Sequence, residues 1–592
     1  MTNTFRLTSQ TAAALALLLG VSVGCARSAT SPEALAAQVT ALADSVFATS
    51  LELEPEIGTR SGIRGAVHSR LSSNSPAALL AGEQRWDVLR ESVKSIDPSS
   101  LEGRPEWALY AVMREQLEAE YGLRVCRLEL WGVASYVNGW QARFTDLALI
   151  QPVGSDSLRA EALARASAVP GWLDQEVANL REGQRLGYSS PKVIVRNVIR
   201  QVDDLVRTPT RSSPFYDPAR RDSAAAFADS LAAIIADGIV PAMRRYRAYL
   251  ADEYLPAARE ALGVSNNPDG AACYAATVRS FATVEMPADS VHAMGLVQMA
   301  RIENEMRTIS ARSFGGESIE TLLPRLTTEA RYTYRTSQEV IDTSEAVIAR
   351  ARAEMPKWFG RLPKAEMIIQ PYPEFRQRAG APGQYQAAPE DGSRPAVFLI
   401  NPSNPTRRSR ASTQTTALHE GIPGHHLQVA IAAERADAHP LIRYSFTSGF
   451  GEGWALYAER LGDEMGVYSS DVARMGMLGS EAFRAARMVI DAGIHMKGWS
   501  REQARAYMRS RTFLDETSLD GEIDRYISWP GQAPSYMIGR TEILLLREES
   551  RARLGERFDI RTFHDRVLEN GTVPLWALRR VVEAWNPTPR VD

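Results

Sequence analysis

The sequence predicts a mainly helical protein that contains one small β-sheet. Three observations lead to this fold class. Up to about residue 360, apolar residues recur at spacings of three and four, with alanine and arginine between them, as in amphipathic helices. Between residues 361 and 411, two short runs of strand-forming residues replace this pattern. Helical spacing returns at residue 413 and continues to the C-terminus.

The expected elements follow in chain order. The clearest helical patterns cover residues 32–51, 158–186, 222–262, 288–310 and 337–355. A turn is expected at 263–270, where Gly, Asn, Pro and Asp cluster. Strands are expected at 367–369 and 396–400, separated by a stretch rich in Gly, Pro and Gln at 379–395. An exposed edge of such a sheet can bind an extended peptide by strand addition.

Length and composition are those of a soluble globular protein with a large core. The 592 residues are 44% hydrophobic and 23% charged, and the formal net charge is −3. This balance argues against a nucleic-acid groove, so we expect no nucleic-acid partner. The basic run Arg407-Arg408-Ser409-Arg410 is short and is expected to be a solvated loop.

The N-terminus has the features of an export signal. Arg6 precedes an apolar run at 12–23 that is shorter than a typical membrane-spanning helix. The following Ser22-Val23-Gly24-Cys25 resembles a lipobox, in which Cys25 would carry a lipid; ordinary cleavage near this point is the alternative. Either way we expect an exported protein of the cell envelope, and the lipidated form would be anchored to a membrane facing the periplasm or the exterior.

Export also bears on the two cysteines that remain. In an oxidising envelope Cys126 and Cys273 could form a disulfide. Two buried thiols are the alternative, because sequence alone does not bring the two residues within bonding distance. Neither cysteine has the local setting of a catalytic thiol.

Three of the eight histidines fall within the segment H-E-G-I-P-G-H-H-L-Q at 419–428, which indicates a zinc site. A His-Glu pair with another histidine about one helical turn on supplies two imidazole ligands and a carboxylate that can take a proton from zinc-bound water. The standard H-E-x-x-H spacing is broken because Pro423 stands four residues after His419. Glu420 is the expected general base.

The second ligand depends on how the chain bends at Pro423-Gly424. In an unbroken helix His419 and His426 would share a face but lie roughly 10 Å apart along the axis. Nitrogens about 2.0–2.1 Å from one zinc cannot be so far apart, so the helix must deform. Without Pro-Gly the segment would read H-E-G-I-H, which favours His425 as the second ligand and leaves His426 as the alternative.

The third ligand is expected at Glu452, in the segment G-E-G-W-A-L-Y-A-E. Glycines flank Glu452 at the start of a helical pattern, so little side-chain bulk would hinder a metal. A catalytic zinc has three protein ligands and an open position, which this set would satisfy. The ordinary alternative is a carboxylate stabilised by the helix dipole. Glu459, two turns on, is expected to support a ligand or to pair with Arg460 or Arg443.

These segments, together with D-A-G-I-H at 491–495 and P-G-Q-A-P-S-Y-M-I-G at 530–539, resemble the bacterial proteins of the domain of unknown function 885 family (DUF885). That family is similar to helical zinc peptidases with a glutamate third ligand. The resemblance extends from about residue 35 to the C-terminus. It implies a zinc site of His419, His425 or His426, and Glu452, in a two-lobed helical body around a cleft. We accordingly expect a signal peptide at 1–25, an N-terminal helical lobe at 26–360 and a catalytic lobe at 361–592.

Two further residues are candidates to stabilise an oxyanion. Tyr536 follows a turn-rich stretch and resembles the tyrosine donor of helical zinc peptidases; a buried aromatic at a helix start is the alternative. His495 follows a helical stretch whose Arg484 and Arg487 could bind a carboxylate, although a lone histidine is more often a hydrogen-bonded core residue. Gln532 is a weaker candidate for contacting a substrate backbone.

The sequence therefore predicts an exported zinc metallopeptidase that hydrolyses short peptides. Two other classes stay open: a zinc hydrolase of a non-peptide amide or ester, and an inactive binding lipoprotein. The cleavage mode and the oligomeric state are not specified by the sequence.

Overall fold

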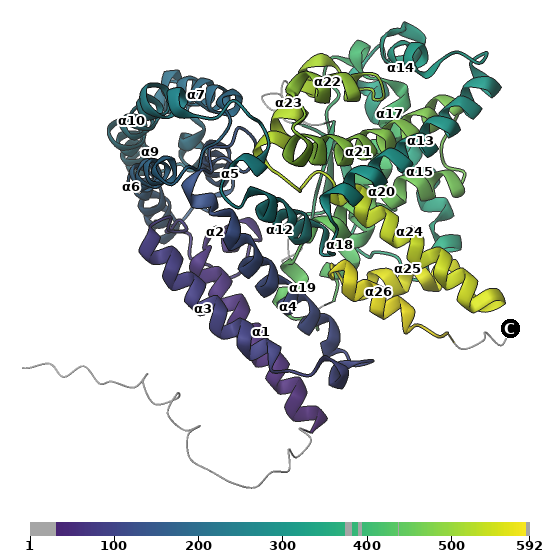
Figure 1. Ribbon diagram of the computed structural model, residues 1–592, viewed down its shortest axis with the longest axis horizontal. Coiled ribbons are helices and arrows are strands. Elements are labelled where there is room, and N and C mark those ends of the chain that lie inside the picture. Colours follow the sequence, from purple (N-terminus) through teal and green to yellow (C-terminus); the bar gives the residue numbers. More distant parts are fainter. Residues whose placement is uncertain (1–30, 373–381, 389–393, 436, 588–592) are drawn as a thin grey trace, which may run out of the picture.

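The computed structural model of the protein describes residues 31–372, 382–388, 394–435 and 437–587 (Figure 1). The predicted signal segment at 1–25, with Cys25, lies outside these residues. The described chain is mainly helical with one three-stranded sheet, which confirms the predicted fold class.

The α-helices of the first 360 residues are α1 (Pro32–Leu53), α2 (Glu56–Arg60), α3 (Pro76–Lys94), α4 (Glu106–Leu123), α5 (Trp140–Ile150), α6 (Asp156–Arg185), α7 (Lys192–Arg207), α8 (Asp217–Arg220), α9 (Ala225–Ala233), α10 (Val240–Tyr249), α11 (Leu255–Ala257), α12 (Gly270–Ala282), α13 (Ala288–Ser313), α14 (Ile319–Thr328) and α15 (Ser337–Trp358). The later helices are α17 (Arg410–Glu420), α18 (His425–Ala433), α19 (Pro440–Tyr444), α20 (Ser448–Glu464), α21 (Asp471–Lys497), α22 (Arg501–Arg509), α23 (Glu516–Ser528), α24 (Ser535–Leu554), α25 (Ile560–Leu568) and α26 (Leu575–Glu583).

The long predicted helices form close to their expected bounds because serine or threonine residues cap their N-termini. Ser31, Ser155 and Thr336 each accept a backbone N–H of the first turn through the side-chain oxygen, which starts α1, α6 and α15. The helix expected at 222–262 runs from α9 to α11, and two π-helical segments, Ile234–Ile239 and Leu250–Tyr254, interrupt its α-helical hydrogen bonding.

The sheet has the strand order β1-β3-β2 (Met367–Pro371, Ala396–Ile400, Gly383–Gln386). β1 is parallel to β3, whereas β2 is antiparallel to it, with Tyr385 opposite Phe398. All five residues of β3 are buried, as a continuous apolar run predicts. β2 is not among the strands predicted from the sequence, because Gly-Gln-Tyr-Gln carries one large apolar residue and becomes a strand through its pairing with β3.

The C-terminal helices form the deepest part of the core. Helix α21 is buried along most of its length and packs against both α13 and α17. Helices α13, α14 and α15 precede residue 360, yet α13 contacts α21, and α14 and α15 contact α17, so they lie with the later helices in Figure 1. The expected boundary at 360 therefore runs through packed helices, and the division into two lobes stays a prediction.

Helices α20 and α24 touch through their backbones. A Cβ atom added at Gly453 would lie 2.6 Å from the Cα atom of Gly539, and one added at Gly539 would lie 1.7 Å from the carbonyl oxygen of Gly449. Atoms cannot approach so closely, so Gly453 and Gly539 require glycine. The contact places the N-terminal parts of the two helices, which carry Glu452 and Tyr536, next to each other.

Two helical stretches of the described chain are long and apolar enough to span a membrane: Pro32–Leu53 and Ala225–Ala257. Each is 33% buried over its most apolar window. α1 packs against α3 and α4, and α9 and α10 pack against α6. Core helices of soluble proteins meet the same criteria, so this finding is weak support for a membrane span.

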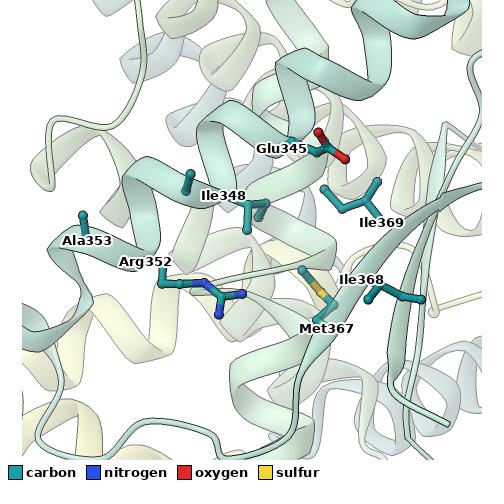
Figure 2. Close-up of a pocket in the computed structure, with 8 residues that line it drawn as sticks. Glu345, Ile348, Arg352, Ala353, Met367, Ile368 and Ile369 are labelled. Carbon is teal, nitrogen blue, oxygen red and sulfur yellow. The ribbon is translucent and has the colours of Figure 1, made fainter.

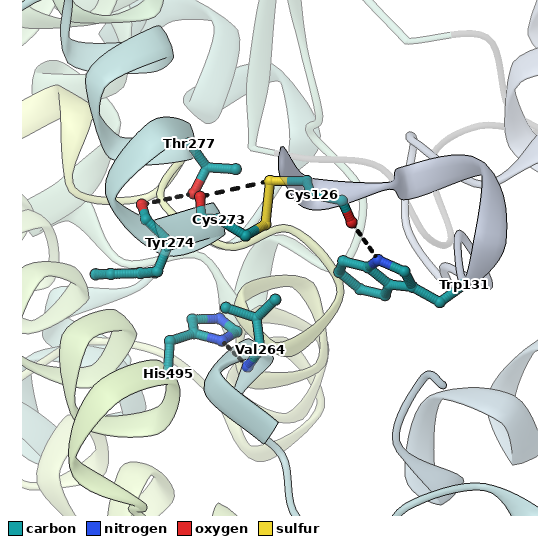
Figure 3. The surroundings of a disulfide bond; sticks show 7 residues. All are labelled: Cys126, Trp131, Val264, Cys273, Tyr274, Thr277 and His495. Carbon is teal, nitrogen blue, oxygen red and sulfur yellow. Dashed lines mark hydrogen bonds between the residues drawn. A yellow bond between two sulfur atoms is a disulfide. The ribbon is translucent and has the colours of Figure 1, made fainter. Parts of the chain in front are cut away.

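A disulfide joins Cys126, which follows α4, to Cys273 in α12 (Figure 3). This pairing was one of the two alternatives left by the sequence. Both cysteines are buried, and the indole of Trp131 donates a hydrogen bond to the carbonyl of Cys126. The bridge joins residues 147 positions apart. It connects the segment after α4 to α12, which packs against α20 and α24.

We predict that the double substitution Cys126→Ser with Cys273→Ser lowers the free energy of unfolding by about 3–5 kcal/mol, because the unfolded chain would no longer be closed into a long loop. Urea unfolding at neutral pH measures this change. Dithiothreitol should destabilise the parent protein by a similar amount and leave the double variant unaffected. Equal stability of the parent under oxidising and reducing conditions would contradict the prediction.

Candidate metal centre

The chain reverses between α17 and α18, and this reversal brings two histidines together. α17 ends at Glu420, one residue after His419, and α18 begins at His425. The amide of Gly424 donates to the carbonyl of Leu418, and a Cβ atom at Gly424 would lie 2.0 Å from the carbonyl oxygen of His419. Glycine at 424 therefore lets the chain fold back against the last turn of α17. The indole of Trp454 donates to the carbonyl of Pro423 and holds the bend in place.

Three donor atoms converge at this reversal. Nε2 of His419 and Nε2 of His425 each lie 3.5 Å from Oε2 of Glu452, and one ligand atom from each residue lies within 4.8 Å of the others. Four ligands placed tetrahedrally at zinc distances are about 3.4 Å apart. Two imidazoles and a carboxylate at this spacing are a donor set that fits zinc and leaves a fourth position open. The structure thus brings together the three residues predicted as ligands, with His425 rather than His426.

Charge also suits a cation at this position. Burial would raise the pKa of Glu452, but the neighbouring His419 and His425 lower it well below its usual range, so the carboxylate is ionised. Burial would lower the pKa of His419, but contacts with Glu452 and Glu459 outweigh burial and raise the pKa to about 9. Buried carboxylates therefore favour a positive charge between these side chains, and a metal ion can supply it.

Glu459 contacts the ring nitrogen of His419 that faces away from Glu452. Its Oε1 lies 2.7 Å from Nδ1 of His419, so the imidazole points its other nitrogen, Nε2, toward Glu452. A carboxylate on the far nitrogen of a ligand histidine fixes its tautomer and orientation. This is one of the two roles predicted for Glu459. Its other close charged partner is Arg484 of α21, at 3.7 Å, rather than Arg460 or Arg443.

His426 is turned away from the other two histidines. Its Nε2 lies 3.1 Å from the carbonyl oxygen of Ala365, and its Nδ1 lies 3.2 Å from the hydroxyl of Tyr385. Burial lowers the pKa of His426 to about 4, so the ring is neutral. Both ring nitrogens therefore have partners in or next to the sheet, and His426 links α18 to the sheet.

Glu420 is half-buried at the end of α17, next to His419 in the chain. Its Oε2 accepts a hydrogen bond of 2.8 Å from the backbone amide of Tyr385 in β2. This amide faces Glu420 instead of β3, so the outer edge of β2 runs beside the predicted general base. This contact cannot be predicted from the sequence, because the residues of β2 do not have a strand pattern.

Tyr536 lies at the start of α24 and is 8% exposed. Nη2 of Arg525 is 3.5 Å from its hydroxyl oxygen, and the guanidinium of Arg487 lies 4.6 Å from the ring centre. An arginine that donates to the phenol oxygen leaves the phenol proton available for another acceptor. The side chain of Gln532, the weaker candidate, is occupied by Arg525 and Ser448.

His495 lies on α21, and its side chain is fully buried (Figure 3). Its Nδ1 accepts the amide N–H of Val264, at 3.0 Å, and its Nε2 is 2.9 Å from the carbonyl oxygen of Tyr526. Both ring nitrogens are therefore bonded to backbone, and neither can donate to an oxyanion. The ordinary alternative, a hydrogen-bonded core histidine, describes this geometry, and we leave His495 out of the candidate centre.

The burial of His495 predicts a pH effect on stability. Burial lowers the pKa of His495 to about 4, below the value of about 6.5 in an unfolded chain. Its contribution is fully present above about pH 6.5 and is lost as the pH falls toward 4, because the unfolded state binds the proton more tightly. The stability difference between the parent and His495→Asn should therefore shrink by about 2–3 kcal/mol between pH 7 and 4.5. Urea unfolding of both proteins at the two pH values measures this; a constant difference would contradict it.

A pocket of about 600 Å³ lies between α15 and β1 (Figure 2). It is lined by α15 and β1, and its walls include Ile348, Arg352 and Met367. Ile348 and Met367 also lie close to Gly421, so the pocket backs onto the turn that follows α17. None of the three converging donor residues lines it, and we assign it no role in the centre.

Comparisons with known proteins agree with the fold and the motifs. A crystal structure of a "putative lipoprotein" from Colwellia psychrerythraea matches with a TM-score of 0.84 and 25% identity, over 93% of this chain and 99% of that one. A structure from Shewanella oneidensis, described as a "putative lipoprotein of unknown function", matches with a TM-score of 0.73 and 17% identity, over 92% and 99% of the two chains, and shows the fold alone. None of the curated proteins matches the chain. The model of a family described as bacterial protein of unknown function matches residues 55–582. Since this match covers most of its length, the chain belongs to the DUF885 family.

Proposed function

We propose that the protein is an exported zinc-dependent peptidase that hydrolyses short peptides. The observation that carries the proposal is the convergence of Nε2 of His419, Nε2 of His425 and a carboxylate oxygen of Glu452, with 3.5 Å between each nitrogen and that oxygen. A site with three protein ligands and an adjacent unliganded carboxylate is typical of catalytic rather than structural zinc.

Three residues of the chain have separate roles in the proposed reaction: Glu420, Tyr536 and Glu459. A zinc ion held by His419, His425 and Glu452 would polarise the scissile carbonyl and make a water molecule acidic enough to attack near neutral pH. Glu420 accepts a proton from the attacking water and delivers it to the leaving nitrogen as the C–N bond breaks, so the hydroxyl remains on the carbonyl carbon. The Tyr536 hydroxyl donates a hydrogen bond to the carbonyl oxygen as negative charge develops on it. Glu459 keeps His419 oriented throughout.

The edge of β2 is the proposed binding site for the peptide backbone. The Tyr385 amide on this edge faces Glu420, so a peptide paired with the edge would run past the general base. Binding would release the Tyr385 amide from Glu420 and free its oxygen to accept a proton. The N-terminal helices would form the opposite wall of a cleft, which favours short peptides over folded proteins.

An envelope location fits the same picture. The similar solved structures are of proteins described as lipoproteins, and the predicted signal segment ends at Cys25. The Cys126–Cys273 disulfide suits an oxidising compartment. We propose export with an anchor at Cys25 as the membrane attachment.

Metal content and turnover, measured together, test the proposal. Purified protein comprising residues 26–592 should bind one zinc per chain and cleave members of a short-peptide mixture analysed by mass spectrometry. Removing zinc with a chelator should abolish cleavage, and adding zinc back should restore it. One zinc without peptide cleavage would replace the peptidase with a hydrolase of another amide or ester, or with a binding protein. A protein that binds no zinc would overturn the proposal.

A further inference from the structure

Three arginines gather around Tyr536, beside the candidate metal centre. Arg484 and Arg487 lie one turn apart on α21, and their guanidinium carbons are 5.9 Å and 4.6 Å from the centre of the Tyr536 ring. Arg525 reaches the same side chain from α23, with Nη2 3.5 Å from the Tyr536 hydroxyl. We call Arg484, Arg487 and Arg525 the arginine cluster.

The arginine cluster is linked directly to the candidate ligands. Nη2 of Arg484 lies 3.7 Å from Oε1 of Glu459, the same oxygen that lies 2.7 Å from Nδ1 of His419. On its other side, Arg525 bonds Gln532, whose amide donates to Ser448 in the first turn of α20, one turn before Glu452. A ligand held by the cluster would therefore lie next to the group that binds the metal.

Positive charge exceeds negative charge in the arginine cluster. Arg487 and Arg525 share one carboxylate, Glu522, at 3.0 Å and 3.4 Å. The only other carboxylate paired with the cluster within the described chain is Glu459, which Arg484 shares with His419. Arg487 and Arg525 are 4% and 7% exposed, so water compensates their charge poorly. Burying a charge without a full complement of opposite charge is unfavourable, and an anionic ligand would offset this cost.

Donors of the cluster are also left unused. Nη1 of Arg487, Nε of Arg484 and Nε of Arg525 are buried and have no hydrogen-bond partner among the described residues. Guanidinium groups recognise carboxylates through paired N–H donors, and these bonds are strong because both partners are charged. Each arginine of the cluster keeps one such free donor, so the three together can bond an anionic ligand such as a carboxylate.

Aromatic side chains border the cluster and leave it partly open. The guanidinium of Arg487 lies 4.1 Å from the ring centre of Phe483, and that of Arg525 lies 5.1 Å from the ring centre of Tyr136. Phe483 and Tyr136 are half-buried, and the Arg484 side chain is 16% exposed. Solvent thus reaches the rim, and the rings supply apolar surface beside the anion site. A carboxylate attached to an apolar group suits this combination.

We propose that the arginine cluster binds the C-terminal carboxylate of a peptide, so that the enzyme cleaves near the free C-terminal end of its substrates. This inference rests on the proposed peptidase function and names its substrate class. The carboxylate would lie against Arg487 and Arg525, and the scissile bond would lie toward Tyr536 and Glu420. An acidic side chain of a peptide carries the same carboxylate group. The binding experiment below distinguishes it from the terminal carboxylate.

Binding to zinc-loaded Glu420→Gln protein tests the inference without turnover. Calorimetry compares the free acid and the C-terminal amide of one peptide with a third peptide, an amide in which the last residue is replaced by glutamate. We expect the amide to bind roughly 10- to 100-fold more weakly than the free acid, because it loses charge-assisted hydrogen bonds. The glutamate amide should stay weak. Equal binding of acid and amide, or full recovery with the glutamate amide, would overturn the assignment.

A matched pair of substitutions locates the site. Arg487→Lys keeps the charge beside Glu522 but loses the free Nη1 donor of the guanidinium, so it should weaken binding of the free acid about 10-fold and leave the amide unchanged. Arg474→Lys, on the same helix but paired with Asp463 and Asp471, should change neither. If Arg487→Lys does not fold, the comparison of acid with amide in the Glu420→Gln protein decides alone.

Turnover by the parent protein separates this inference from the proposed function. Cleavage near the C-terminus of the free acid, with little cleavage of the amide, supports both. Equal cleavage of acid and amide leaves the peptidase standing and overturns the inference. Preferential binding of the free acid without cleavage of any peptide supports the carboxylate site and overturns the peptidase.

Discussion

Replacing Glu420 with glutamine should reduce peptide hydrolysis roughly 10³- to 10⁴-fold while one zinc per chain remains bound. Glutamine has the same shape as glutamate, and its side-chain oxygen can still accept the amide of Tyr385. It cannot, however, take a proton from water or return one to the leaving amine. The proposed zinc ligands His419, His425 and Glu452 are untouched, so metal content and folding should not change.

Three measurements on the same preparations check this result: kcat on a peptide that the parent cleaves, zinc per chain by elemental analysis, and the midpoint of thermal unfolding. Glu548→Gln is a matched control, because Glu548 lies on α24 with 61% of its side chain exposed and pairs only with Arg551 within the described chain. The control should keep full activity. Undiminished activity in Glu420→Gln would exclude Glu420 as the base, and simultaneous loss of zinc would show that the residue holds the metal.

Replacing His425 with alanine should remove zinc and activity together, whereas the neighbouring His426→Ala should retain the metal. In His425→Ala the two remaining donors, His419 and Glu452, cannot hold zinc as a three-ligand site does. We expect the zinc dissociation constant to rise by more than the 10- to 100-fold that loss of an outer contact causes. His426 bonds Ala365 and Tyr385, so its loss should lower stability rather than metal affinity.

Competition with a zinc-binding dye gives both dissociation constants, and the two variants serve as each other's control because they differ by one position. The reverse outcome, with zinc lost from His426→Ala and kept by His425→Ala, would mean that α18 rotates when the metal binds. Loss of zinc from both would indicate that the reversal between α17 and α18 needs both imidazoles to form.

The sequence predicted the fold class and the three converging residues because both depend on local signals. Helical spacing and serine or threonine caps set α1, α6 and α15 close to their expected bounds. Pro423-Gly424 required a break, and removing it from the pattern pointed to His425. The structure gives the physical reason: Gly424 packs against the last turn of α17, and the chain re-enters a helix one residue later.

Features that depend on distant segments could not be predicted from the sequence. β2 forms through pairing with β3, and its contact with Glu420 joins residues 35 positions apart. The role of His495 is set by Val264 and by Tyr526 from another helix. The sequence indicates Arg484 and Arg487 as carboxylate binders, but not Arg525, which reaches Tyr536 from α23. In each case the deciding partner has no recognisable spacing from the residue that it positions.

The glycines that press α20 against α24 have a consequence for how this protein can change during evolution. Glu452 lies on α20 and Tyr536 lies on α24. The distance between these helices is set by main-chain atoms of Gly449, Gly453 and Gly539, and no side chain there can be enlarged or shortened to change it. The spacing between the proposed metal ligand Glu452 and the phenol of Tyr536 is thus protected against ordinary substitutions. The arginines on α21 and α23 and the aromatic rim are held by side chains alone and can be exchanged one at a time. A lineage with this fold could therefore acquire new substrates while its reaction chemistry stays fixed.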